Sequence, residues 1–179
     1  MKKDILVVVF VLFSFTNIIA QSNNAVGNIN FSIPSVAILN IVTDNTISFS
    51  SPSQAGVIIT PGASTSNWLN YSSIVTRDYT NKITVNISSG QLPESTSIKL
   101  ETGADMGGGA GRVGTPVNEI TLSESPQDII TGIGSCYTGT GMQKGHQLIY
   151  SWITDKKYNN SKVCTDNTIA LTYTILAAD

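Results

Sequence analysis

The side chains that could do chemistry are few, and they do not cluster in the sequence. His146 is the only histidine, and it follows a glycine-rich turn at residues 139–145. A nucleophilic triad would need a nucleophile and a carboxylate placed beside it by the fold, but no serine lies in a nucleophile-elbow pattern. A lone histidine also supplies too few ligands for zinc. We therefore expect His146 at a solvent-facing end of a strand, and we predict no catalytic residue and no metal site.

The chain has two cysteines, Cys136 and Cys164. In an oxidising compartment an even pair is most simply a disulfide, and the alternative is one catalytic thiol beside a spare one. No asparagine or aspartate pattern accompanies the histidine to support a thiol enzyme. We predict a Cys136–Cys164 disulfide, whose loop of about 28 residues would stabilise the fold by about 3–4 kcal/mol in the chain-entropy model.

Residues 103–114 are rich in glycine, and Gly109, Gly111 and Gly114 match the spacing of a dinucleotide-binding motif. That motif binds a pyrophosphate only where it joins a strand to the N-terminus of a helix. Here Pro116 and an alternating segment follow instead. We interpret the stretch as a flexible surface loop, with contact to a ligand as the alternative because glycine lets a backbone approach closely.

Acidic side chains offer two further kinds of chemistry. Asp105 and Glu101 could give oxygen ligands to calcium, but the dense carboxylate spacing of a calcium loop is absent. Glycoside hydrolysis needs two carboxylates aligned across a cleft, and no such pair stands out in the sequence. We predict that the protein binds no cofactor and is not an enzyme, with a secreted hydrolase as the least favoured alternative.

Aromatic side chains could bind sugars if their faces were exposed. Tyr150, Trp152 and Tyr173 share faces with aliphatic residues, so we expect them to pack in the core. Tyr137 and Tyr158 are better candidates for exposure and for contact with a ligand. A carbohydrate-binding module is therefore an alternative function.

Alternation of apolar and polar residues is the main structural signal. It runs through residues 82–89 and 168–176, and residues 146–154 place Leu148, Tyr150 and Trp152 together on one face. Residues 36–42 form a denser apolar run, which we expect to be buried on both faces. Shorter candidate strands are residues 46–49, 57–60, 68–75, 97–101 and 118–122.

Turn residues separate these segments, and apolar residues do not recur at helical spacing over the length of a helix. Serine, threonine, asparagine and β-branched residues also form helices poorly. About nine short strands separated by turns predict an all-β fold, a single β-sandwich of immunoglobulin-like or jelly-roll type.

The beginning of the chain has the three parts of a secretory signal peptide. Lys2 and Lys3 give a positive start, an apolar run follows, and Ala20 is the small residue at the expected cleavage site. The apolar run is shorter than the ~20 residues that cross a bilayer. We predict that residues 1–20 are removed and that residues 21–179 form one mature domain without a transmembrane span. Its location would be the periplasm, the cell surface or the medium.

Charge narrows the range of partners. The whole chain has a net charge of −2, and only 12% of its residues are charged. A weakly acidic chain without a stripe of lysine and arginine does not suit nucleic acid, whose phosphates must be neutralised. It is equally unsuited to electrostatic binding at a membrane surface.

Residues 25–33 follow the predicted signal peptide and alternate at Ile29, Phe31 and Ile33. Two outcomes are open for them. They could pair within their own sandwich as an edge strand, which we favour. They could instead act as a donor strand and insert into the sheet of a neighbouring copy, because an extended segment completes an open edge through main-chain hydrogen bonds. The second outcome would produce a head-to-tail fibre.

Three segments, residues 68–72, 133–137 and 171–174, together with the signal peptide, resemble uncharacterised bacterial secreted β-sandwich proteins. They are more distantly similar to fimbrial subunits and spore-coat-type surface proteins. Chaperone–usher pilins typically have a penultimate tyrosine in their last strand, whereas Tyr173 is six residues from the end of this chain. The resemblance implies a structural or adhesive role at the cell surface, as a fimbria-like or surface-layer component. Its partners would be other surface proteins, copies of itself or a glycan.

Overall fold

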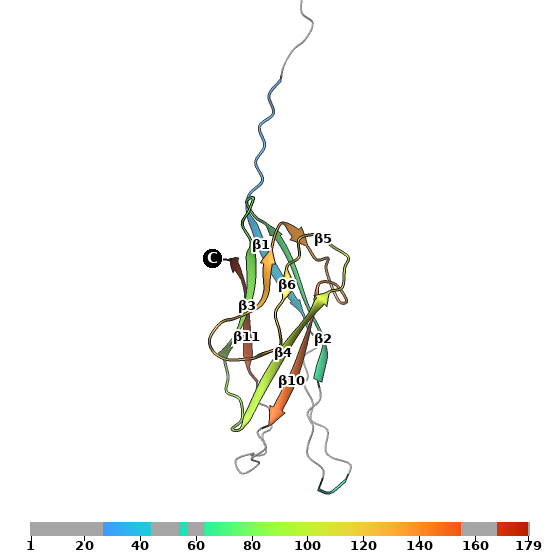
Figure 1. The fold of residues 1–179 in the computed structure, drawn as a ribbon, viewed down its shortest axis with the longest axis vertical. Helices are drawn as coiled ribbons and strands as arrows, with labels where there is room; N and C mark the ends of the chain where they lie inside the picture. Colours follow the sequence, from blue (N-terminus) through green and yellow to red (C-terminus); the bar gives the residue numbers. More distant parts are fainter. Residues whose placement is uncertain (1–26, 44–53, 57–62, 155–167, 179) are drawn as a thin grey trace, which may run out of the picture. The chain divides into compact units, whose positions relative to one another are not determined.

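The computed structural model describes four stretches of the chain, residues 27–43, 54–56, 63–154 and 168–178 (Figure 1). The chain divides into two units between Ile33 and Pro34. The described part of the first unit, residues 27–33, contains no strand. In the second unit every regular element is a β-strand, and none of its described residues is helical. The predicted all-β class is therefore confirmed.

The described residues form eleven strands, which range from two residues to the twelve of β2. Their bounds are β1 (Val36–Val42), β2 (Ala63–Ile74), β3 (Asn81–Ser89), β4 (Thr96–Asp105), β5 (Ala110–Gly111), β6 (Thr115–Pro116), β7 (Ile120–Thr121), β8 (Gln127–Ile133), β9 (Cys136–Tyr137), β10 (His146–Thr154) and β11 (Ala170–Ala177). All the pairings between them are antiparallel and lie in two sheets.

The larger sheet has seven strands in the order β5-β9-β2-β10-β4-β7, and β1 also pairs with β2. Trp68 and Leu69 of β2 pair with both β1 and β10, while Ser72 and Ser73 pair with both β1 and β9. Because a strand has only two edges, β9 and β10 share one edge of β2 and β1 occupies the other. Within the described part of the chain, β1 is therefore an edge strand whose second backbone edge is free.

The smaller sheet has the order β11-β3-β8-β6. Leu171 of β11 lies opposite Ile87 of β3, and Tyr173 lies opposite Val85. Among the described strands β11 pairs only with β3, so it is a second edge strand. It approaches β1 without pairing to it. Among the described strands, the unpaired edges of β1 and β11 consequently lie next to each other.

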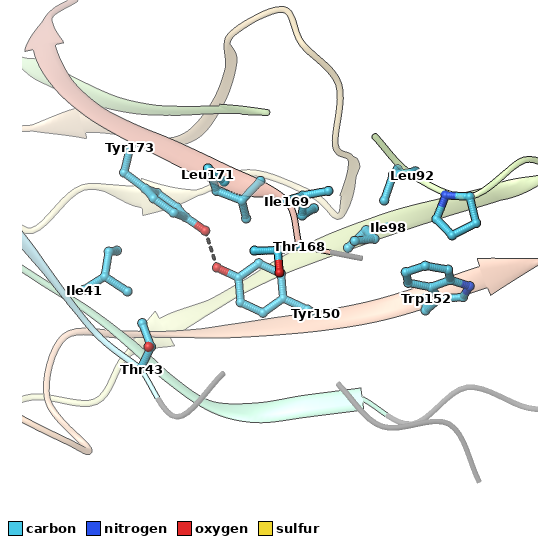
Figure 2. Close-up of a pocket in the computed structure, with 12 residues that line it drawn as sticks. Ile41, Thr43, Leu92, Ile98, Tyr150, Trp152, Thr168, Ile169, Leu171 and Tyr173 are labelled. Atoms are coloured by element: carbon cyan, nitrogen blue, oxygen red, sulfur yellow. Dashed lines mark hydrogen bonds between the residues drawn. The ribbon is translucent and has the colours of Figure 1, made fainter. Parts of the chain in front are cut away.

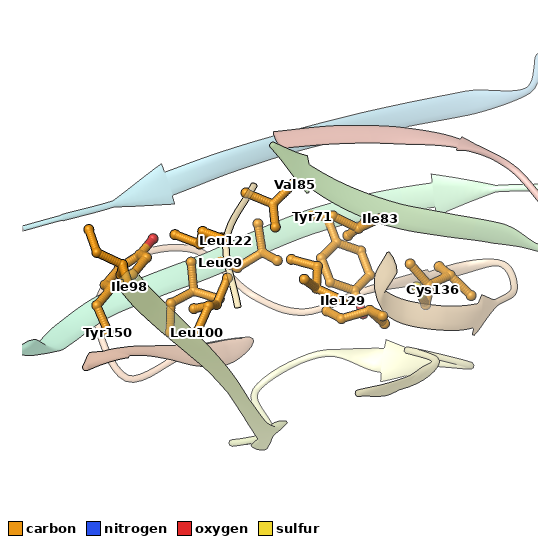
Figure 3. Packing of buried hydrophobic residues seen from close by; sticks show 13 residues of the cluster. Leu69, Tyr71, Ile83, Val85, Ile98, Leu100, Leu122, Ile129, Cys136 and Tyr150 are labelled. Carbon is orange, nitrogen blue, oxygen red and sulfur yellow. The ribbon is translucent and has the colours of Figure 1, made fainter. Parts of the chain in front are cut away.

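The inner faces of the two sheets pack into one hydrophobic core (Figure 3). Leu69 and Leu100 come from the larger sheet, and Ile83 and Val85 come from the smaller one; all four are buried almost completely. The remaining buried members are Tyr71, Ile98, Leu122, Ile129, Ile130, Ile133, Cys136, Leu148 and Tyr150. Two antiparallel sheets that share one core form a β-sandwich.

Most of the predicted strands are found. The segments 82–89, 146–154 and 168–176 correspond to β3, β10 and β11, and 68–75, 97–101 and 118–122 correspond to β2, β4 and β7 with other bounds. The candidates at 46–49 and 57–60 lie outside the described residues, as does the predicted signal peptide. Strands β5, β6, β8 and β9 are absent from the prediction.

Residues 36–42 do form a strand, but the expectation that both of its faces are buried is wrong. Ile38 is 65% exposed, and the inward Leu39 and Ile41 are only half-buried. The physical reason is position, because an edge strand has a neighbour on one side only. The dense apolar run therefore lies at the border of the sandwich.

Candidate functional site

A groove lies between the two edge strands, at the end where β1 stops and β11 begins (Figure 2). Its volume is about 550 Å³. Leu171 and Tyr173 line it from β11, Ile41 lines it from β1, and Tyr150 and Trp152 line it from β10. We call this cavity the β1–β11 groove. Its other lining residues are Thr43, Leu92, Pro93, Ile98, Thr168, Ile169 and Ala170.

The inner face of β11 is incompletely covered. Val85 on the central strand β3 is fully buried, whereas Tyr173, its cross-strand partner on the same face, is only half-buried. Leu171 and Ile175 continue this face of β11 and are also half-buried. A sandwich closed at this edge would cover these side chains. The groove is thus an opening into the apolar interior between the sheets.

The chemistry of the groove is apolar and uncharged, since none of its lining residues carries a charge. The hydroxyls of Tyr150 and Tyr173 hydrogen-bond to each other and join the two sheets (Figure 2). Burial raises the pKa of both tyrosines, so both remain neutral. The described lining therefore offers no carboxylate, imidazole, amine or thiol, and it suits an apolar, uncharged occupant.

Residues 27–33 carry the three most exposed large apolar side chains of the described chain. Ile29 is 88% exposed, Phe31 is 85% exposed and Ile33 is 69% exposed. The favoured prediction, an edge strand paired within its own sandwich, is not found, because these residues form no strand. Large apolar side chains are seldom left exposed together in so short a segment, and such exposure indicates a surface that meets a partner.

His146 is fully buried, so the prediction of a solvent-facing strand end is wrong. It begins β10, which has β2 on one edge and β4 on the other. Its Nδ1 lies 2.8 Å from the carbonyl oxygen of Gly103, and its Nε2 lies 3.0 Å from the hydroxyl of Tyr71. Burial lowers the pKa of His146 from its ordinary value of 6.5. The ring is therefore a neutral part of the internal hydrogen-bond network.

Asp105 and the glycine-rich loop stabilise each other. The Oδ2 atom of Asp105 accepts a hydrogen bond of 3.0 Å from the backbone amide of Gly107. A Cβ atom at Gly109 would lie 1.8 Å from the carbonyl oxygen of Tyr137, because the loop here runs against β9. This close approach of two backbones explains the glycine without a ligand. Among the described residues, no cluster of three acidic, histidine or cysteine side chains could hold a metal ion.

The other predicted site residues are not brought together. Tyr137 is 53% exposed on β9, in agreement with the expected exposure. Tyr158 lies outside the described residues. Cys136 is a buried free thiol in the structure, and its predicted partner Cys164 also lies outside the described part. No disulfide is seen in the described chain, and the Cys136–Cys164 pairing stays a prediction for peptide mapping under non-reducing conditions.

Sequence reasoning missed the β1–β11 groove itself. The prediction of core packing is confirmed for Tyr150, whereas Trp152 and Tyr173 are half-buried and pack against the core from its border. It does not reveal an opening beside them, because the opening depends on β1 and β11, which lie far apart in the sequence. The only sequence signal was the apolar density of residues 36–42, and that density also fits a central strand.

Comparisons of the chain with known protein families, with curated protein sequences and with solved structures found no match. Among the described residues there is no helix of the length and hydrophobicity needed to cross a membrane. The features of the described chain that bear on its function are therefore the β1–β11 groove and residues 27–33.

Proposed function

We propose that the protein is an exported, non-enzymatic surface protein with a structural role, a subunit that assembles with further subunits through the β1–β11 groove. In this proposal the groove accepts an extended strand from a neighbouring subunit. The product is a fimbria-like or surface-layer polymer.

One observation carries the proposal: among the described strands, β1 and β11 each have an unpaired edge, and these edges flank an apolar opening into the core. An unpaired edge strand presents a row of amides and carbonyls that another strand can pair with. Leu171 and Tyr173 leave apolar surface uncovered beside such an edge. Covering it would stabilise an assembly by about 25 cal/mol per Å² of apolar surface buried.

The residues that could have served catalysis have structural contacts instead, which is in keeping with a structural role. His146 is held between Gly103 and Tyr71, and Asp105 binds the backbone of the glycine-rich loop. The uncharged groove adds no general acid or base.

Assembly of the mature chain, residues 21–179, tests this function. Sedimentation velocity over a range of concentrations should show polymers. Leu171→Arg, which places a charge on the inner face of β11, should abolish them. Thr172→Arg, on the exposed face of the same strand, is the matched control and should leave them intact. A mature chain that stays monomeric at its highest soluble concentration would contradict the function.

Carbohydrate binding is the second candidate, and one observation favours it: the ring of Tyr137 is 53% exposed. A glycan array with the mature chain decides between the two. We expect no retained glycan. Binding that is lost in Tyr137→Ala and kept in Leu171→Arg would favour the carbohydrate-binding function instead.

A further inference from the structure

We propose that the strand accepted by the β1–β11 groove is residues 27–33 of a second copy of this chain. This inference rests on the proposed function and names the partner at its site. The edge of β11 that is unpaired among the described strands pairs with the incoming backbone, which adds a fifth strand to the four-stranded sheet. Ile29, Phe31 and Ile33 face the open core.

The side-chain pattern of the segment fits that position. Alternate residues of a strand point to one face and lie about 6.5–7 Å apart. Ile29, Phe31 and Ile33 therefore form an apolar row, and Leu171, Tyr173 and Ile175 form a row with the same period on β11. The intervening Asn28, Asn30 and Ser32 would point outward to solvent. Phe31 is the largest member of the incoming row, and the groove offers it the rings of Tyr150 and Trp152.

The length and the charge of residues 27–33 also fit the β1–β11 groove. Residues 27–33 match the seven residues of β1, the strand on the other side of the opening, and approach the eight of β11. Neither this segment nor the lining of the groove contains a charged residue. Burial of the segment therefore leaves no charge unpaired, which would otherwise be costly. It also makes the contact insensitive to screening by salt.

Insertion of residues 27–33 of one copy into the groove of the next produces a polymer, because each copy has one segment to donate and one groove to fill. A contact between two different surfaces does not close on itself unless a ring forms, so copies add head to tail. The last copy in a chain would keep an open groove, and the first would keep an exposed segment.

Two variants of the mature chain separate donation from acceptance. Phe31→Asp removes the largest apolar side chain of the segment, and Asn30→Asp adds the same charge on the opposite face as its control. Leu171→Arg blocks the groove. We expect Phe31→Asp alone and Leu171→Arg alone to be monomeric, and Asn30→Asp to polymerise like the parent chain.

An equimolar mixture of Phe31→Asp and Leu171→Arg is the decisive sample. One variant can only accept and the other can only donate, so the mixture should form dimers and nothing longer in sedimentation velocity. A mixture that stays monomeric would overturn the proposal. So would Phe31→Asp chains that polymerise as the parent does. That result, with polymers still lost in Leu171→Arg, would leave the proposed function standing and reject this segment as its partner.

A second measurement covers the case in which Leu171→Arg fails to fold. A synthetic peptide of residues 27–33, added in excess to the parent chain, should compete for grooves and shorten the polymers. The same peptide with Phe31→Asp should have no effect. Equal effects of the two peptides, or no effect of either on an assembled parent chain, would contradict the proposal.

Discussion

The hydroxyl of Tyr71 lies 3.0 Å from Nε2 of His146, and the two rings are stacked with their centroids 5.7 Å apart. The carbonyl of Gly103 can only accept, so the Nδ1 atom that faces it at 2.8 Å carries a proton. In the neutral ring Nε2 is then an acceptor. The Tyr71 hydroxyl also contacts the carbonyl oxygen of Val113. Its single proton is therefore shared between two acceptors, this oxygen and Nε2 of His146.

The first prediction follows from the burial of this ring. Because burial lowers the pKa of folded His146 below 6.5, the unfolded chain binds more protons than the folded one as the pH falls below 6.5. The free energy of unfolding should therefore decrease between pH 6.5 and 5, with a slope of at most about 1.4 kcal/mol per pH unit. Urea denaturation of the mature chain across this range measures it.

His146→Gln is the control for that experiment. The chain has no other histidine, so the variant should have a lower but nearly constant free energy of unfolding between pH 6.5 and 5. An equal pH dependence in the parent and the variant would show that another group titrates there.

How far the sequence predicts this fold is clear from particular strands. The bounds of β10 agree with the prediction, because Leu148, Tyr150 and Trp152 recur at every second position and so share one face. Strand β8 was missing because Ile129 and Ile130, adjacent in sequence, are both fully buried. The pairing of β3 with β8 shifts register beside Ile83, so a simple alternation does not describe it.

Burial at the ends and edges of strands could not be predicted, because it depends on contacts between distant residues. His146 is enclosed by β2 and β4, while the apolar residues 36–42 form an edge. Local composition is the same for a central and an edge strand. The β1–β11 groove has the same origin, since it forms where two strands distant in sequence come together.

The second prediction concerns the close contact of the glycine-rich loop with β9. Gly109→Ala should lower the free energy of unfolding by more than about 2 kcal/mol, because the new Cβ would lie 1.8 Å from a backbone oxygen of Tyr137 and one backbone must move. Gly103→Ala is the matched control, because its Cβ would meet the nearest atom at 3.5 Å, an ordinary contact. Urea denaturation compares the two. Equal effects would mean that the loop is not held against β9.

The third prediction tests the core shared by the two sheets. Leu148 is fully buried on β10, and its truncation to alanine should cost about 2–5 kcal/mol of unfolding free energy through lost contacts and a cavity. Met142 is 59% exposed, and Met142→Ala should change the free energy of unfolding by less than about 0.5 kcal/mol. Thermal and urea unfolding should agree on this order. A small effect of Leu148→Ala would contradict the packing described for the sandwich.

The last prediction concerns the hydrogen bond between Tyr150 and Tyr173, which links the two sheets inside the β1–β11 groove. Tyr150→Phe or Tyr173→Phe alone leaves the other, part-buried hydroxyl without this partner, which costs at most about 1–3 kcal/mol. The double variant removes both hydroxyls and leaves an apolar contact of nearly the same shape. It should therefore lose clearly less unfolding free energy than the two single variants lose together. Tyr137→Phe is the control at an exposed ring and should be close to neutral. Losses that simply add in the double variant would show that the two hydroxyls do not depend on each other, and that water satisfies each of them separately in the groove.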